Sequence, residues 1–128
     1  MYMASPRKTI LVIHPAAADP AAIRRLLGNM GHIAVTAAGR RAALKALGTV
    51  RFDVILTSVG AMRPGSDRSF VQELRAVAPG SAVVGLNERG VDAANEAWMG
   101  ECDATIRAPL SSSKLQWTLD FELRYFGS

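Results

Sequence analysis

Residues 51–67, RFDVILTSVGAMRPGSD, decide the fold because a run of apolar residues here leads into a polar loop. The run has no polar–apolar alternation at its centre, and that pattern is typical of a strand buried on both faces in a parallel sheet. We therefore predict a strand at Phe52–Val59. The loop that follows, Gly60–Ser66, contains a Pro-Gly dipeptide, which is a strong turn signal.

Strand-like runs and helical patterns alternate on both sides of this strand. We predict further strands at Thr9–Ile13, Ile33–Thr36, Ala82–Leu86 and Ala104–Ile106. Apolar residues at helical spacing predict helices over 20–30, 40–47, 70–77, 92–99 and from about 111 to 125. Gly31 and Gly48 are the expected ends of the first two helices. In the third helix, Phe70, Val71, Leu74 and Val77 are the expected core face.

This alternation predicts a single α/β domain. We expect a doubly wound, five-stranded parallel sheet with five helices on its two faces and the flavodoxin-like strand order 2-1-3-4-5. The domain should span residues 9–126, after an N-terminal extension at 1–8. Ligand sites in this architecture lie at the carboxyl ends of the strands, which here are the loops at His14–Asp19, Val59–Asp67, Asn87–Gly90 and Arg107–Leu110.

Composition excludes several classes of protein. The chain has 128 residues, 49% of them apolar and 20% charged, which suits one soluble globular core. No apolar run approaches the roughly 20 residues of a membrane helix, and the N-terminus lacks a signal-peptide layout. One cysteine, Cys102, rules out an internal disulfide and fits a cytoplasmic protein. We expect its thiol to be buried or half-buried rather than reactive.

The net charge of +4 raises the question of nucleic acid. However, the Lys and Arg residues are scattered in ones and twos, and no basic stripe with interleaved aromatic residues stands out. We therefore expect a solvated basic surface and no direct nucleic-acid binding.

Three fragments in order resemble the receiver domain of response regulators. TILVIHPAAADPAAIRRLLGNMGH resembles the family's first strand and helix, RFDVILTSVGAMRPGSD its central strand and loop, and CDATIRAPLS its last strand and proline turn. The resemblance extends from Thr9 to about Tyr125. It implies the flavodoxin-like fold and a role in two-component or phosphorelay signalling.

The resemblance also implies where the family's reactive residues should lie, and this chain departs from them. The positions of the acidic pair, the phosphoacceptor aspartate, the switch hydroxyl, the switch aromatic and the lysine are occupied by His14 and Pro15, Ser58, Asn87, Thr105, and Ala108. Proline cannot ligate a metal through its side chain, histidine is a poor magnesium ligand, and serine cannot form an acyl phosphate. We therefore predict a non-enzymatic pseudo-receiver with no cofactor, no metal site and lost Mg²⁺ binding.

Other interpretations of the strand-end residues stay open. Asp67 or Glu88 could act as a displaced acceptor or rebuild a cation site, and Ser58 could be a serine phosphosite. His14 could be a metal ligand or a titrating switch, against the plainer expectation of a loop histidine with a local hydrogen bond. A small-molecule sensor with its ligand at the strand ends is the alternative from another class of function.

The last predicted helix has two apolar stripes. Leu115, Leu119, Leu123 and Phe126 form the expected core face. Trp117, Phe121 and Tyr125, each four residues apart, form a second stripe that is either also buried or an exposed patch for a protein partner or a second copy. The resemblance favours the patch, because the fourth helix, fifth strand and fifth helix form the output and dimer surface of ordinary receivers. Trp98 could extend this patch or fill the core.

Overall fold

The computed structural model describes residues 7–13, 20–59, 66–87, 102–107 and 111–123. Its strands are β1 (Thr9–Ile13), β2 (Ile33–Ala37), β3 (Val54–Val59), β4 (Ala82–Asn87) and β5 (Ala104–Arg107). Its helices are α1 (Pro20–Asn29), α2 (Arg40–Thr49), α3 (Ser66–Val77) and α4 (Ser112–Trp117), and α4 continues into a π-helix, η3 (Thr118–Glu122). The predicted helix at Asp92–Met99 lies outside the described residues.

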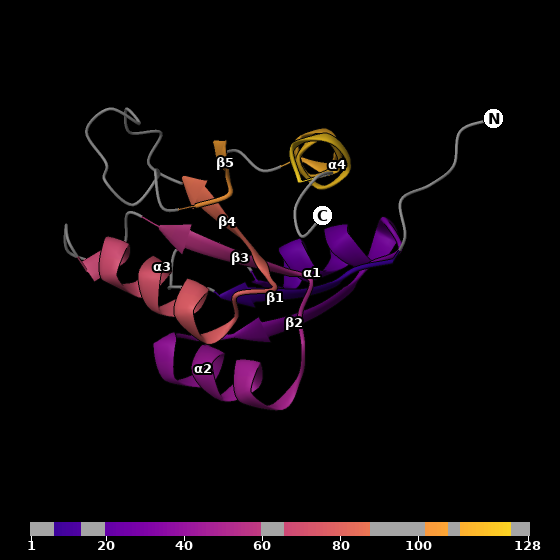
Figure 1. Ribbon diagram of the computed structural model, residues 1–128. Helices are drawn as coiled ribbons and strands as arrows, with labels where there is room; N and C mark the ends of the chain where they lie inside the picture. The colour runs from indigo at the N-terminus through magenta and orange to yellow at the C-terminus, as the bar shows by residue number, and fades with distance from the viewer. Residues whose placement is uncertain (1–6, 14–19, 60–65, 88–101, 108–110, 124–128) are drawn as a thin grey trace.

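The five strands form one parallel sheet in the order β2-β1-β3-β4-β5, which confirms the predicted fold class (Figure 1). β3 lies at the centre of the sheet, between β1 and β4. All strands run in the same direction, so they all begin at one end of the sheet, here called the amino end, and finish at the other, here called the carboxyl end.

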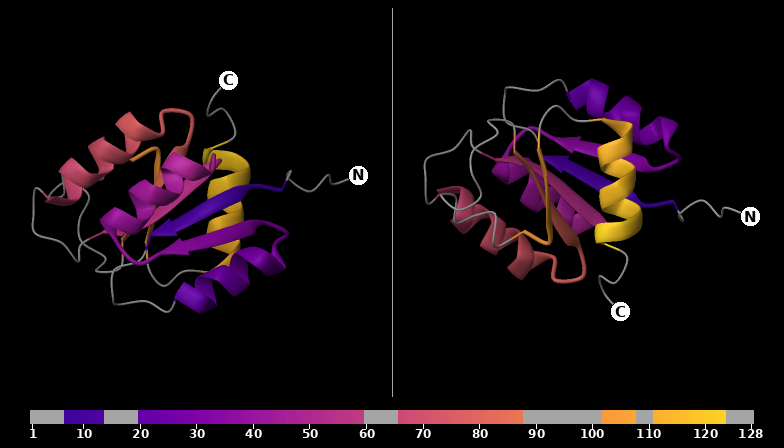
Figure 2. Two further views of the ribbon diagram at one scale, coloured as in Figure 1. Left: turned by 90° about the horizontal axis from the view of Figure 1, so that it is seen from below. Right: turned by 90° about the horizontal axis from the view of Figure 1, so that it is seen from above.

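Each face of the sheet has its own core. Alternate residues of the strands, such as Ile10 and Val12 of β1, pack with α1 and the last helix. The intervening residues, such as Leu11 and Ile13, pack with α2 and α3 on the opposite face. Figure 2 shows α2 and α3 in the view from below, and α1 and α4 in the view from above. Strands buried on both faces explain why the sequence has continuous apolar runs there.

One of the two helix ends predicted at a glycine agrees with the structure, and the other differs. α1 is followed by Gly31, whose φ of 89° requires glycine, as expected for a helix stop. α2 passes Gly48 and ends at Thr49, where the N–H of Val50 donates to the carbonyl of Ala46 and completes the last turn. A glycine is tolerated inside a helix at a modest cost, so glycine alone does not mark the end.

Helix α3 departs from the prediction at its start and agrees with it at its end. It begins at Ser66, in the region predicted as loop, and it ends at Val77. Phe70, Val71 and Leu74 are buried as predicted, but Val77 is 49% exposed, so its assignment to the core face was wrong. Val77 is the last residue of α3, where the chain turns into the loop that enters β4.

Side chains form hydrogen bonds to backbone groups at the amino end of the sheet. The carboxylate of Asp53 accepts the N–H of Thr9 (2.9 Å), and that of Asp103 accepts the N–H of Val83 (2.8 Å). The hydroxyl of Ser81 donates to the carbonyl of Phe52 (2.6 Å) in a buried position. Backbone groups at strand starts that would otherwise lack partners are thereby satisfied.

The imidazole of His32, which is buried, joins this network of bonds. Its Nδ1 accepts the N–H of Lys8 at 3.1 Å, so this nitrogen must be unprotonated for the bond to form. Burial lowers the pKa of His32 below 6.5 and nearby Lys8 lowers it further, while Asp120 of η3 raises it. His32 thus connects the α1–β2 turn to the residue before β1, at the amino end of the sheet.

Strand β2 is one of the two outer strands of the sheet, and its exposed face is apolar. Its sequence, IAVTA, contains no charge and no proline, and Ile33 and Val35 are exposed. The other outer strand, β5, alternates buried and exposed residues, and its exposed ones are Thr105 and Arg107.

The last helix packs on the sheet through the predicted leucine stripe. Leu115, Leu119 and Leu123 are buried in the core shared with α1. Ser111 is the N-cap, and its hydroxyl accepts the N–H of Lys114. Phe126, the fourth member of the predicted stripe, lies outside the described residues.

Candidate functional site

The strand pairing places several of the predicted positions together at the carboxyl end of the sheet. Ile13, the residue before His14, pairs with Thr57 of β3, and Ser58 is the residue after Thr57. At the next strands, Asn87 pairs with Val59 on one side and with Arg107, the residue before Ala108, on the other. The backbone register therefore agrees with the expectation that the strand-end positions adjoin one another.

Only part of this predicted site is described. Ser58 and Asn87 are described as strand residues, without their side chains, and Thr105 is an exposed residue of β5. Asp67 lies in the first turn of α3, also without a described side chain. His14, Pro15, Glu88 and Ala108 lie outside the described residues.

Among the described side chains, the carboxyl end has no carboxylate that could ligate magnesium. Mg²⁺ prefers carboxylate oxygens in a near-octahedral arrangement. In the stretch 52–59 the one carboxylate is that of Asp53, and it lies at the opposite end of the sheet, bonded to the N–H of Thr9. The residues described also contain no group of three or more His, Cys, Asp or Glu side chains placed to hold a metal ion.

A hollow of about 310 Å³ lies beside β5, against the start of the last helix. Its lining includes the cations Arg107 and Lys114, the hydroxyls of Thr105 and Ser113, and the indole of Trp117. The ammonium of Lys114 donates to the carbonyl of Arg107 at 2.8 Å, which ties the helix to the end of β5.

Trp117 is the most exposed of the large apolar side chains described, at 57%. Of the two alternatives for the second stripe, this exposure supports the surface patch at Trp117. Phe121 lies in η3 but its side chain is not described, and Tyr125 and Trp98 lie outside the described residues. The rest of the stripe therefore stays a prediction.

Lys114 was missed as a site residue in the sequence, although a signal was available. It stands three residues before Trp117 on one helix, and residues at that spacing lie on the same face. Cys102 is half-buried and packs against the core on the α2–α3 face, as predicted for a small structural side chain.

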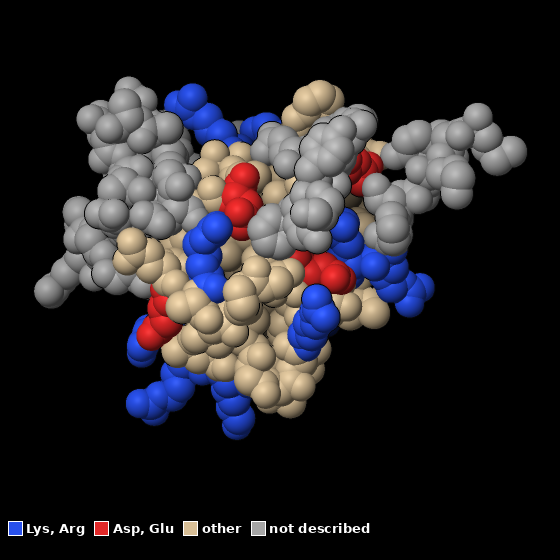
Figure 3. All heavy atoms as spheres, viewed as in Figure 1, with Lys and Arg blue, Asp and Glu red and all other residues tan. Residues whose placement is uncertain are grey.

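Charge on the surface is dispersed. In the face shown in Figure 3, Lys and Arg side chains are separated by other residues and by acidic groups, and they form no continuous stripe. Some are paired: Arg40 with Glu73 at 2.7 Å, and Arg75 with Asp103 at 3.0 Å. The pairing with Glu73 raises the pKa of Arg40. Among the described residues, no helix is long and apolar enough to cross a membrane.

Comparison with known proteins finds similarity in structure only. No family model and no curated protein matches the chain. A CheY-like receiver domain from Methylobacillus flagellatus superimposes with a TM-score of 0.78 at 19% identity, covering 91% of this chain and 99% of its own. The receiver domain of a sensor histidine kinase from Pseudomonas aeruginosa, with magnesium in its active-site cleft, has a TM-score of 0.73 at 19% identity, covering 96% of this chain and 100% of its own.

A third similar structure is a protein described as pilus assembly-related, from Burkholderia pseudomallei. Its TM-score is 0.77 at 18% identity, and the match covers 100% of this chain and 97% of that protein. Identities this low establish a shared fold. The chain therefore has the fold of response-regulator receiver domains.

Proposed function

We propose that this receiver-fold chain is a cytoplasmic, non-enzymatic signalling module of the two-component type, spanning residues 9–126, that acts through protein contacts without aspartyl phosphorylation. The observation that carries the proposal is the residue at the end of the central strand. Ser58 stands there, and Asp53, the carboxylate of this strand region, is engaged at the amino end with Thr9. A seryl hydroxyl cannot form the acyl phosphate on which the switching of ordinary receivers depends.

In this proposal the partner binds the last helix. Trp117 is the exposed residue of that surface, and Phe121 and Tyr125 continue the aromatic stripe along the helix. An exposed tryptophan beside two cations suits the core of an interface, where aromatic residues and arginine are enriched. The occupant is a protein partner or a second copy of the chain.

Intact mass after incubation with acetyl phosphate and Mg²⁺ tests the first half of the proposal. We expect no change in mass, while a receiver domain that retains its acceptor aspartate, treated in parallel, gains one phosphate. A labile one-phosphate adduct on this chain would overturn the pseudo-receiver proposal. The variants Asp67→Asn and Glu88→Gln would then show whether a displaced acceptor carries it, and Ser58→Ala would reveal a stable serine phosphate.

Solution mass by light scattering tests the self-association version of the second half. If a dimer forms through the last helix, Trp117→Ala with Phe121→Ala shifts the mass towards monomer. Arg41→Ala, which removes an exposed side chain of α2 on the other face of the sheet, is the control and should leave the mass unchanged. A wild-type protein that is already monomeric at high concentration would leave the protein partner as the occupant.

A further inference from the structure

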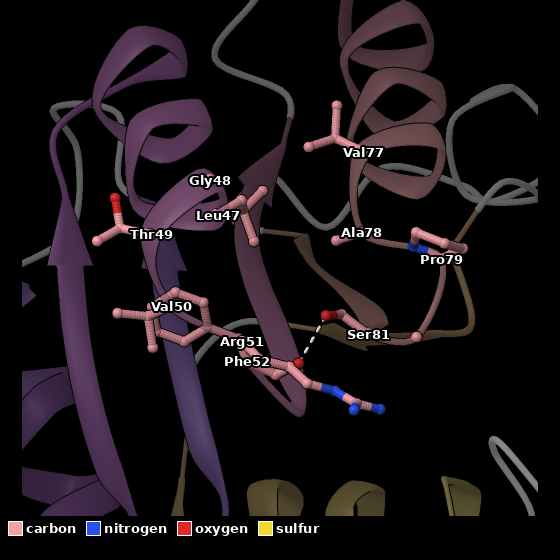
Figure 4. Close-up of a pocket in the computed structure, with 11 residues that line it drawn as sticks. Leu47, Gly48, Thr49, Val50, Arg51, Phe52, Val77, Ala78, Pro79 and Ser81 are labelled. Carbon is pink, nitrogen blue, oxygen red and sulfur yellow. Dashed lines mark hydrogen bonds between the residues drawn. The ribbon is translucent and has the colours of Figure 1, made fainter.

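A cleft of about 380 Å³ lies at the amino end of the sheet, far along the strands from the predicted phosphorylation positions. It is formed where α2 and α3 end side by side and the chain turns into β3 and β4 (Figure 4). Phe52 and Ser81, both buried, close it on the sheet side. The Ser81 hydroxyl is already bonded to the carbonyl of Phe52.

The flanks of the cleft are apolar and exposed. Val50, after the end of α2, is 46% exposed, and Val77, at the end of α3, is 49% exposed. Figure 4 shows these two side chains on opposite sides of the cleft, with Leu47 between the helices. Val77 is thus exposed although its spacing in α3 places it with the apolar residues, and a second exposed valine, Val50, lies across the cleft. Exposed apolar groups mark a contact site when they form one patch, and Val50 and Val77 line the same cleft.

One positively charged side chain, that of Arg51, lies at this cleft. Arg51 is exposed, and a β-carbon on Gly80 would lie 3.5 Å from one of its guanidinium nitrogens, so the side chain reaches across the α3–β4 turn. Arg40 and Arg75, on the two helices, are paired with Glu73 and Asp103. For Arg51, by contrast, no ion pair or hydrogen bond is found within the described part of the chain, and no acidic side chain lines the cleft.

The cleft also offers hydrogen-bond acceptors. Two helices end here, and carbonyls in the last turn of a helix lack partners within the helix. Such carbonyls carry partial negative charge and attract donors. A ligand that suits the site therefore has a carboxylate for Arg51, an apolar group for the valines and N–H donors for the helix ends.

We propose that this cleft binds an extended segment of a partner protein in which an acidic residue stands next to branched aliphatic residues. Such a peptide supplies all three kinds of group. Its carboxylate pairs with Arg51 in a charge-assisted hydrogen bond, and its aliphatic side chains cover Val50 and Val77. The site is separate from the Trp117 surface, which is at the last helix on the other face of the sheet, and it does not depend on whether the chain is phosphorylated.

A titration followed by amide chemical shifts tests the proposal, with acetyl-Val-Asp-Leu-amide as the probe and acetyl-Val-Asn-Leu-amide as its uncharged match. We expect the aspartyl peptide to shift the amides of Val50, Arg51 and the non-proline residues of the α3–β4 turn (Val77, Ala78, Gly80 and Ser81) saturably at millimolar concentrations. The asparaginyl peptide should bind about five-fold more weakly, which is the size of effect expected for one partly exposed ion pair.

Two variants test whether Arg51 is the residue that pairs with the peptide carboxylate. Arg51→Gln should remove the difference between the peptides, while Arg41→Gln, an equal charge change on an exposed arginine in the first turn of α2, should preserve it. Dispersed amide spectra confirm that both variants fold. No shifts at millimolar peptide, equal binding of both peptides or shifts centred on Trp117 would each overturn the proposal. A dimer that Arg51→Gln dissociates would identify a second copy as the occupant instead and would equally overturn it.

Discussion

The two ends of the sheet use polar residues for different purposes. At the amino end, Asp53, Asp103, Ser81 and His32 bind backbone groups of neighbouring segments. At the carboxyl end, the Ser111 hydroxyl caps the last helix, and Lys114 donates to the carbonyl of Arg107. The amino end therefore contributes to stability. The carboxyl end, together with the adjoining last helix, presents Thr105, Arg107 and Trp117 to solvent.

Residues at the carboxyl end of this fold can therefore vary without disturbing the contacts that order the strands. The groups that order the strands lie at the opposite end from the positions of Ser58 and Asn87. Substitutions at the carboxyl end thus leave the hydrogen bonds at the amino end intact. If the comparison is correct, substitutions at the amino end should change the free energy of unfolding, and those on the exposed surface near the carboxyl end should change association.

The largest effect is expected for Phe52→Ala. Phe52 is among the largest fully buried side chains, and its removal leaves a cavity at the entry to β3. We expect the free energy of unfolding, measured with urea, to fall by about 3–5 kcal/mol. Thr105→Ala on the exposed face of β5 is the control and should change it by less than about 0.5 kcal/mol. Similar losses in the two variants would contradict the division between the ends.

A smaller loss is expected for Asp103→Ala. One carboxylate oxygen of Asp103 accepts the N–H of Val83, and the other pairs with Arg75. Leaving the N–H without a partner should lower the free energy of unfolding by about 1–3 kcal/mol. Asp103→Asn, which retains an acceptor oxygen, should lose less. If both variants lost the same amount, the ion pair and not the backbone bond would be responsible.

His32 should make stability depend on pH. Because the folded-state pKa of His32 lies below 6.5, protonation favours the unfolded chain. The stabilising contribution of neutral His32 is therefore fully present above pH 6.5 and is lost as the pH falls from 6.5 through the lowered pKa. Urea unfolding at several pH values should show this loss in the wild type and a flatter profile for His32→Gln. At neutral pH, His32→Ala should cost about 1 kcal/mol for the lost hydrogen bond. Equal slopes in wild type and His32→Gln would remove His32 from the amino-end network.

The smallest effect on stability is expected for Trp117→Ala. Because the indole is 57% exposed and the leucine stripe holds the helix, we expect the free energy of unfolding to change by less than about 0.5 kcal/mol. Binding to the partner or second copy should weaken at the same time. A loss of more than about 2 kcal/mol by urea denaturation would show that Trp117 belongs to the core, and the contrast between the two ends would then fail.

The sequence predicts the framework well because strands and helices here follow simple periodic patterns. β1 has the predicted bounds, and Gly31 ends α1 because its backbone conformation requires glycine. Gly48 carried the same signal but lies inside α2, where the sequence alone cannot reveal that Val50 completes the turn. Val77 fits the apolar face of α3 by spacing, yet at the helix end it meets a cleft and not the sheet.

The candidate sites were predictable only in part. The stripe of aromatic residues on the last helix identified Trp117, since spacing separates it from the leucines. The neighbouring Arg107 and Lys114 come together through contact between β5 and the helix, which periodicity does not reveal. Arg51 gave no signal at all, because its significance depends on the pairing of other arginines with acids far away in sequence.

The sequence of strand β2 affects how readily the protein should aggregate. It is an outer strand without charge, proline or bulky polar residues, and two branched side chains lie exposed along it. Unprotected outer strands are templates on which other chains add by backbone pairing, the first step of aggregation. We therefore expect solubility at high expression to depend on Ile33 and Val35 at this side of the sheet, and Val35→Lys to reduce aggregation.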